Sequence, residues 1–177
     1  MIGHLADGGP PHAATSAAAP DGVRVREATI EDLSAVVELR LALVREHDRN
    51  PIYRRLRPDA PERARRLFAA QLRAPGEVIF LAERESRVIG ILRCVQSSGL
   101  PLLFPSRHGY ISSVYVAPGE RRRGVLRALL SRAVEWCRAR GLREVRLHSA
   151  VENDVANAVW DALGFRIVEH LRVCPLP

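Results

Sequence analysis

The most informative stretch of this 177-residue sequence covers residues 116–130 and reads VAPGERRRGVLRALL. An apolar strand ends here, a basic turn follows, and a helical pattern of apolar residues begins. The first N–H groups of a helix have no partner within the helix, and the helix dipole places partial positive charge there. Gly124 lets a ligand approach the backbone closely, and Arg121, Arg122 and Arg123 add guanidinium groups that suit phosphate. The stretch therefore predicts an anion site at a strand-to-helix turn, with a cluster of solvated arginines as the alternative explanation.

Periodicity on both sides of this turn predicts an α/β fold with a mixed sheet. Residues 1–20 are rich in Ala, Gly and Pro, which is typical of a disordered tail, and they leave 21–177 as one folded domain. The sequence contains neither the G-x-x-x-x-G-K-[ST] nor the G-x-G-x-x-G pattern, which excludes two common nucleotide-binding loops. Alternation predicts strands at 23–26, 78–83, 88–96, 110–116, 145–149 and 165–173, and helical spacing predicts helices at 29–46, 61–72, 123–140 and 153–163.

The composition, 47% hydrophobic and 27% charged, is that of a globular chain. No apolar run approaches the ~18 residues that span a bilayer, and the first residues lack the features of a secretory signal. We therefore expect a cytoplasmic protein without membrane contact. Three cysteines far apart in the sequence argue against a disulfide framework and against zinc spacing, so we expect buried free thiols and no metal at Cys94, Cys137 and Cys174.

The net charge is +7, and all 27 basic residues are arginine. Such a charge suits an anionic partner, although a GC-rich coding bias would produce the same composition. Aromatic residues make up only 5% of the chain and do not alternate with basic ones, as base stacking would require. Nucleic-acid binding is therefore the least favoured function, and we expect no nucleic-acid partner.

Two motifs together resemble the GNAT superfamily of acetyl-CoA-dependent N-acetyltransferases. The acetyl-CoA signature [RQ]-x-x-G-x-[GA] corresponds to RRRGVL at residues 121–126. The downstream pattern N-x-x-A-x-x-L-Y-x-x-x-G-F corresponds to NDVANAVWDALGF at residues 153–165. The resemblance extends over residues 23–173 and implies one GNAT-like α/β domain, whose central sheet is mixed, mostly antiparallel and flanked by about four helices.

The resemblance also implies acetyl-CoA as cosubstrate. Its pyrophosphate is expected at the backbone amides of residues 121–126, and its pantetheine arm along residues 114–116, paired like an added strand. A backbone N–H of that strand would stabilise the developing oxyanion, and Asn153 would contact the arm. The cofactor-binding residues implied in this way are Val114, Tyr115, Val116, Arg121, Arg122, Arg123, Gly124, Val125, Leu126, Arg127 and Asn153.

The chain departs from the family pattern at three places. Leu126 replaces a Gly or Ala beside the pyrophosphate turn. Trp160 replaces a Tyr that often protonates the leaving thiolate; because an indole N–H does not give up its proton, Trp160 is expected only to hydrogen-bond the thiolate. Ser112 and Ser113 stand where relatives often carry carboxylates, so the usual base is missing.

A base must then come from elsewhere, or water must serve. His148 is the favoured general base, because histidine titrates near neutral pH and this residue lies next to the expected acetyl site. His108 is a second candidate, and a packed or solvated strand histidine is the alternative explanation for both. The first long helix ends at Glu46, His47 and Asp48, where relatives often bind the acceptor. These residues could meet an amine, and a solvated helix end is the alternative explanation.

The predicted reaction is direct attack by a primary amine on acetyl-CoA, and the alternative is a non-catalytic acyl-CoA-binding module. The acceptor, a small molecule or a protein amine, is open. The segment 40–59 is rich in arginine, and the segment 97–109 contains no acidic residue, which favours a neutral or acidic amine such as an amino-acid derivative or a peptide end. The sequence leaves the oligomeric state open; dimers are common in the family that the chain resembles, and the strand at 165–173 could take part in a homodimer.

Overall fold

The computed structural model describes residues 19–174 and 176, so that most of the segment expected to be a tail lies outside the described part. The sheet and three helices belong to one compact unit that ends at His148, and the residues from Ser149 onward form another. The first unit contains β1 (Val23–Glu27), α1 (Leu33–Glu46), α2 (Ala60–Gln71), β2 (Glu77–Arg84), β3 (Arg87–Ser98), β4 (Arg107–Val116), α3 (Val125–Ala139) and β5 (Val145–Leu147). The second contains α4 (Asp154–Ala162).

The five strands form one sheet in the order β1-β2-β3-β4-β5. The first three pairings are antiparallel and the last, between β4 and β5, is parallel. The predicted fold class, α/β with a mixed and mostly antiparallel sheet and four α-helices, is therefore confirmed. The expectation of a single domain over residues 21–177 stays a prediction.

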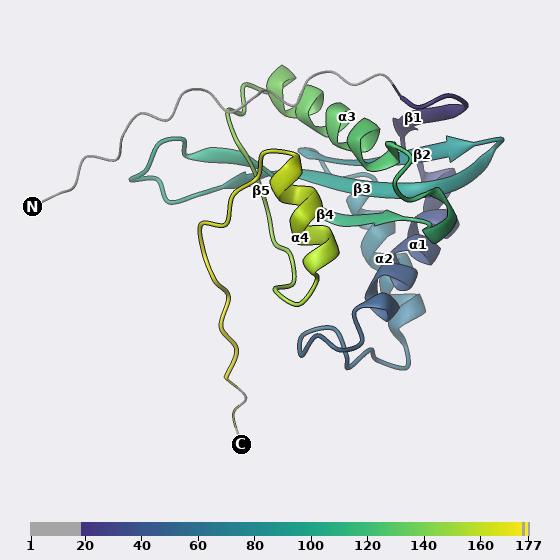
Figure 1. Cartoon of the computed structure of the whole chain (residues 1–177), viewed down its shortest axis with the longest axis horizontal. Helices are drawn as coiled ribbons and strands as arrows, with labels where there is room; N and C mark the ends of the chain where they lie inside the picture. The colour runs from purple at the N-terminus through teal and green to yellow at the C-terminus, as the bar shows by residue number, and fades with distance from the viewer. Residues whose placement is uncertain (1–18, 175, 177) are drawn as a thin grey trace, which may run out of the picture. The chain divides into compact units, whose positions relative to one another are not determined.

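Helices cover both faces of the sheet (Figure 1). On one face, α1 and α2 bury Val36, Val37, Leu41 and Phe68 against strand residues Ile79, Leu81, Ile91 and Tyr115. On the other face lies α3, and a Cβ added at Gly90 of β3 would stand 3.3 Å from Leu129 and 3.4 Å from Val125 of this helix. Burying aliphatic side chains in this way is the main favourable contribution to folding.

The α3 face also brings together two cysteines that are 43 residues apart. The sulfur atoms of Cys94 on β3 and Cys137 on α3 lie 3.5 Å apart, and both residues are buried. The hydrogen bond between the two thiols and burial raise the pKa of Cys94, and the same hydrogen bond lowers the pKa of Cys137. Cys94 and Cys137 are buried, as expected, whereas Cys174 is exposed, so the expectation of a buried thiol was wrong there.

The strand predicted at 165–173 is absent, so this prediction was wrong. Residues Phe165–Cys174 take no regular structure, and four apolar side chains of the segment are between 59% and 85% exposed: Ile167, Val168, Leu171 and Val173. A strand is stable only when its backbone groups pair with a neighbour, and none of the strand pairings in the described residues includes this segment. The homodimer in which this segment could take part stays a prediction.

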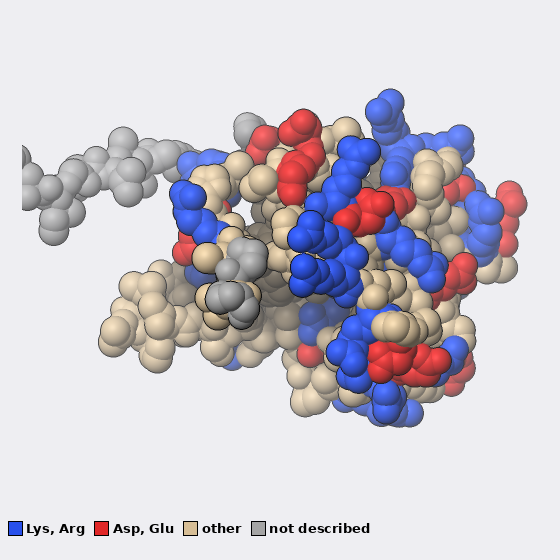
Figure 2. Space-filling model, turned by 90° about the horizontal axis from the view of Figure 1, so that it is seen from below, with Lys and Arg blue, Asp and Glu red and all other residues tan. Residues whose placement is uncertain are grey.

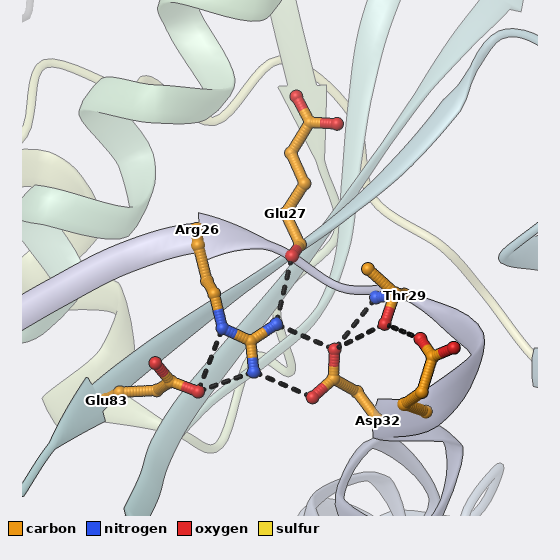
Figure 3. Close-up of polar contacts among 6 residues, drawn as sticks. Arg26, Glu27, Thr29, Asp32 and Glu83 are labelled. Atoms are coloured by element: carbon orange, nitrogen blue, oxygen red, sulfur yellow. Dashed lines mark hydrogen bonds and ion pairs between the residues drawn. The ribbon is translucent and has the colours of Figure 1, made fainter. Parts of the chain in front are cut away.

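An arginine joins the start of the chain's first helix to the edge of the sheet (Figure 3). The guanidinium of Arg26 on β1 donates two hydrogen bonds of 2.7 Å to the carboxylate of Asp32, and its Nε donates to Glu83 of β2 at 2.9 Å. The Thr29 backbone N–H also donates to Asp32, at 2.8 Å. The Arg26 guanidinium lowers the pKa of Asp32 from 3.8 to about 2, chiefly by hydrogen bonding.

Replacing Asp32 by Asn should lower the free energy of unfolding by about 2 kcal/mol near neutral pH, because the pKa difference measures the ion-pair stabilisation. The folded-state pKa lies below the unfolded one, so this stabilisation is complete above pH 3.8 and is lost as the pH falls towards 2. Urea unfolding of wild type and Asp32→Asn at about pH 7 and about pH 3 measures the effect.

The difference between the two proteins should shrink at the lower pH. Glu38→Gln removes an exposed carboxylate of α1 that has no ion pair among the described residues and should change little at either pH. An unchanged stability of Asp32→Asn near neutral pH would contradict the assigned role of the Arg26 pair.

Candidate active site

The candidate site begins where β4 extends beyond the end of its pairing with β5. The parallel pairing joins Gly109, Tyr110 and Ile111 to Val145, Arg146 and Leu147 and then stops, whereas β4 continues to Val116. Within this unit, one edge of β4 therefore carries backbone groups beyond Ile111 that no strand pairs. An extended ligand can add to such an edge as a further strand.

A bulge lies in the same part of β4. The register with β3 shifts between the pairs Ile91–Tyr115 and Arg93–Ser112, so that β4 has one extra residue there. Ser113 takes a φ of 53° at this point, a conformation that non-glycine residues rarely adopt. The extra residue is not paired with β3. Beyond it, the Tyr115 side chain packs in the core under α1. Only the backbone of Tyr115 is thus left for a ligand.

The free edge of β4 leads into the basic turn and the start of α3. Gly124 precedes the helix with a φ of 80°, and Arg122 takes a φ of 61°. No side chain caps the first amides of α3, so these N–H groups point outward with the dipole's positive end. Arg122, Arg123 and Arg127 are exposed around them. Val125 itself is buried, which leaves its backbone for a ligand.

Arg121 differs from the other arginines of the turn. Its Nε donates to the carbonyl of Val116 at 2.8 Å, and one terminal nitrogen contacts both carboxylate oxygens of Glu46 at 2.7 and 2.8 Å. The guanidinium also lies 5.5 Å from the centre of the Tyr115 ring. Instead of standing free as a phosphate ligand, the Arg121 side chain ties the end of β4 to the end of α1, and Glu46 is occupied by this pair.

A tyrosine–histidine pair lies at the other end of the unpaired edge. The Tyr110 hydroxyl and His148 Nδ1 are 2.7 Å apart, because β4 and β5 place Tyr110 opposite Arg146, two residues before His148. His148 is exposed and Tyr110 is half-buried. Burial raises the pKa of Tyr110, so its phenol stays protonated at neutral pH. The structure thus joins His148, the predicted base, to Tyr110, a contact that the sequence did not indicate.

The second histidine candidate has a different environment. His108 is 6% exposed, and its Nδ1 has no hydrogen-bond partner among the described residues. Burial lowers its pKa, and Arg146 lowers it further. A buried neutral imidazole of this kind is a packing residue of β4 rather than an accessible base.

Two predicted site residues lie in the other compact unit, where each has a local structural role. The Asn153 side-chain oxygen accepts a hydrogen bond of 3.0 Å from the Ala156 backbone N–H and so caps α4. Trp160 is 9% exposed and packs edge-to-face against Phe165, with ring centres 5.3 Å apart. Roles for Asn153 at the pantetheine arm and Trp160 at the thiolate stay predictions.

Sequence reasoning missed two arginines on the α1 face of the sheet. Arg93 of β3 donates to Glu77 at 2.6 Å and to the Ser112 hydroxyl at 3.0 Å. Arg40 of α1 lies close enough to Tyr53, Tyr110 and Arg93 for each of them to affect its pKa. No local motif marks either arginine, because the register of β3 with β4 and the packing of α1 bring them to this place.

The described residues contain no group of three or more His, Cys, Asp or Glu side chains that could hold a metal ion. Nor does any helix in residues 19–174 have the length and hydropathy of a membrane span.

Residues 42–165 match the sequence profile of the acetyltransferase (GNAT) family. One relative is the chloroplastic GCN5-related N-acetyltransferase 6 of Arabidopsis thaliana, 39% identical over 64 residues, which is 36% of this chain and 22% of the relative. An uncharacterized N-acetyltransferase of Methanocaldococcus jannaschii is 27% identical over 141 residues, 80% of this chain and 59% of the relative. The chain thus spans less than two thirds of these relatives.

Solved structures share the fold at low sequence identity. A predicted acetyltransferase from Clostridium acetobutylicum, solved with acetyl-CoA, superposes with a TM-score of 0.72 at 20% identity and covers 86% of this chain and 96% of its own. The aminoglycoside antibiotic 6′-N-acetyltransferase of Acinetobacter baumannii has a TM-score of 0.71 at 18% identity, over 88% of this chain and 99% of its own.

Proposed function

Since the chain belongs to the acetyltransferase (GNAT) family, we propose that it transfers an acetyl group from acetyl-CoA directly to a primary amine. One observation carries the proposal: within one compact unit, the unpaired edge of β4 runs into the uncapped N-terminus of α3. The first feature suits an extended amide-containing arm, and the second suits a pyrophosphate.

The residues of this unit fit acetyl-CoA, which when bound supplies the acetyl group as a reactive thioester. The amides at the start of α3 would hold the pyrophosphate, with Arg122, Arg123 and Arg127 around them. Strand alternation directs the backbone groups of Val114 and Val116 to the same edge. The Val116 carbonyl already accepts from Arg121, so Val114 offers the freer N–H and C=O for the arm.

Binding can be tested apart from catalysis by thermal unfolding with acetyl-CoA, with desulfo-CoA and ADP as comparison ligands. A ligand at 100 times its dissociation constant should stabilise the fold by about 2.7 kcal/mol. Gly124→Glu should abolish this stabilisation by acetyl-CoA. A side chain at this φ of 80° strains the backbone, and its Cβ would stand 3.1 Å from Pro20. The glutamate carboxylate would also bring a negative charge to the anion site.

Gly141→Glu is the matched control. Gly141 follows the same helix α3 with a φ of 69°, and a Cβ there would meet nothing within 4 Å. This variant carries similar backbone strain but should keep the acetyl-CoA shift. Loss of the shift in both variants, or in neither, would contradict the assigned pyrophosphate site.

We infer that His148 is the general base and that Tyr110 positions it. For Nε2 to accept the amine proton, Nδ1 must carry the ring hydrogen and donate it to the Tyr110 oxygen. The 2.7 Å contact allows this arrangement, and the raised pKa of Tyr110 keeps the phenol neutral, so that it orients the ring without adding a charge.

His148→Ala should lower kcat/KM for an amine by about 10² to 10⁴. Tyr110→Phe should lower kcat/KM less, because the imidazole remains. His170→Ala, at an exposed histidine of the other unit, should leave the rate unchanged. A His148→Ala enzyme with wild-type kcat/KM would assign the proton transfer to water.

A non-catalytic acyl-CoA-binding module remains the second candidate. It is favoured by Ser112, which accepts a hydrogen bond from Arg93 at the place where a carboxylate base is common in the family. This candidate requires the acetyl-CoA shift without turnover of any amine. The cytoplasmic location, the absence of nucleic-acid partners and the homodimer stay predictions.

A further inference from the structure

An open groove of about 410 Å³ lies between α1, α2 and the segment that joins them. Its volume is within the range of small-molecule sites, about 300–1,000 Å³. The apolar part of its lining includes Leu41, Val44, Ile52, Leu56, Leu67 and Phe68. The lining also contains four arginines: Arg40, Arg55, Arg57 and Arg63. The groove thus combines an apolar surface with positive charge.

Carboxylates do not balance this charge within the groove. None of the residues that line it is Asp or Glu. Asp59 lies nearby and pairs with Arg57 at 3.1 Å and Arg63 at 2.7 Å, which leaves Arg40 and Arg55 without an ion pair among residues 19–174. Residues 40–73 contain ten arginines and four acidic residues. Arginine also predominates over acidic residues on the face shown in Figure 2.

Arg40 is the member of the groove whose charge most needs a counter-ion. It is half-buried, and this burial lowers its pKa. Removing a charge from water is unfavourable unless an opposite charge or hydrogen bonds replace the lost hydration. Its charged neighbour Arg93 lowers the pKa further. A ligand anion at Arg40 would therefore be held strongly.

Arg40 also connects the groove to the proposed base. Its guanidinium is close enough to Tyr53, within the groove, and to Tyr110, outside it, for both phenols to affect its pKa. Tyr110 in turn contacts His148 at 2.7 Å. A ligand whose anionic group meets Arg40 and whose apolar part lies in the groove would therefore lie close to Tyr110, the residue that contacts His148.

We propose that the acceptor is a small primary amine that carries its own anionic group and an apolar side chain, of the class of apolar amino acids, with Arg40 binding the anion. The inference rests on the proposed acetyl transfer and names its acceptor. A polycationic amine of the aminoglycoside type does not fit, because the groove lining offers it arginines and no carboxylate.

The first test measures steady-state acetylation with matched acceptors, L-phenylalanine and L-phenylalaninamide, which differ in the carboxylate. Wild type should prefer phenylalanine at least about tenfold in kcat/KM, which corresponds to one charge-assisted contact. Arg40→Gln should raise KM for phenylalanine about tenfold or more and leave KM for the amide and for acetyl-CoA unchanged. Arg66→Gln, an exposed arginine of α2 outside the groove lining, is the matched control.

Calorimetric binding of N-acetyl-L-phenylalanine separates this inference from the proposed function, because it needs no turnover. Binding to wild type that weakens about tenfold or more in both Arg40→Gln and Arg55→Gln supports the groove as an anion site. Turnover of phenylalaninamide or an aminoglycoside in preference to phenylalanine would overturn the acceptor class and leave acetyl transfer intact. Binding without turnover of any amine would overturn the proposed function alone, and failure to bind would overturn the groove assignment.

Discussion

Backbone N–H and C=O groups need partners, and β4 has too few neighbours to supply them along its whole length. On one edge it is paired with β3, apart from the bulge at Ser113. On the other edge the pairing with β5 ends at Ile111. The part of β4 that remains unpaired within this unit is also the part that leads into the turn before α3. The proposed ligand site is thus a consequence of an incomplete sheet.

The basic turn after β4 combines structural and binding roles that its sequence does not separate. Arg121, Arg122 and Arg123 are identical as residue types, yet Arg121 alone reaches Val116 and Glu46. This clamp joins the end of the core strand to α1, and it keeps one carbonyl of the free edge occupied. Its neighbours Arg122 and Arg123 remain exposed beside the amides of α3. The contacts of Arg121 thus fix the turn to the end of β4, while the guanidinium groups of Arg122 and Arg123 stay accessible to a ligand.

The groove beside α1 is the proposed acceptor site, and its charge is the basis of the proposed acceptor class. Several solved structures with this fold are aminoglycoside acetyltransferases, but fold similarity at about 20% identity carries no information about the acceptor. The charged residues around the groove do carry such information, because arginines favour anionic ligands and carboxylates favour cationic ones. In this chain the half-buried Arg40 lines the groove and lies close enough to Tyr110 for the phenol to affect its pKa, and Tyr110 contacts His148.

The sequence by itself determined the order and type of the elements, because hydrophobic periodicity, caps and turn residues are local signals. It also located the turn at Gly124, since a strand, a basic loop and a helix start follow one another along the chain. Its false strand at 165–173 shows the limit of this reasoning: apolar alternation is local, but a strand exists only where a neighbour pairs with it.

Tertiary structure alone decided which distant residues meet. The register between β4 and β5 brought Tyr110 to His148, and the packing of α1 on the sheet placed Arg40 and Glu46 near residues far along the chain. These contacts depend on strand pairing and helix packing, which no local motif encodes. For that reason the sequence could indicate a cosubstrate, whereas the contact of the proposed base with Tyr110 and the charge of the proposed acceptor groove emerged only from the folded chain.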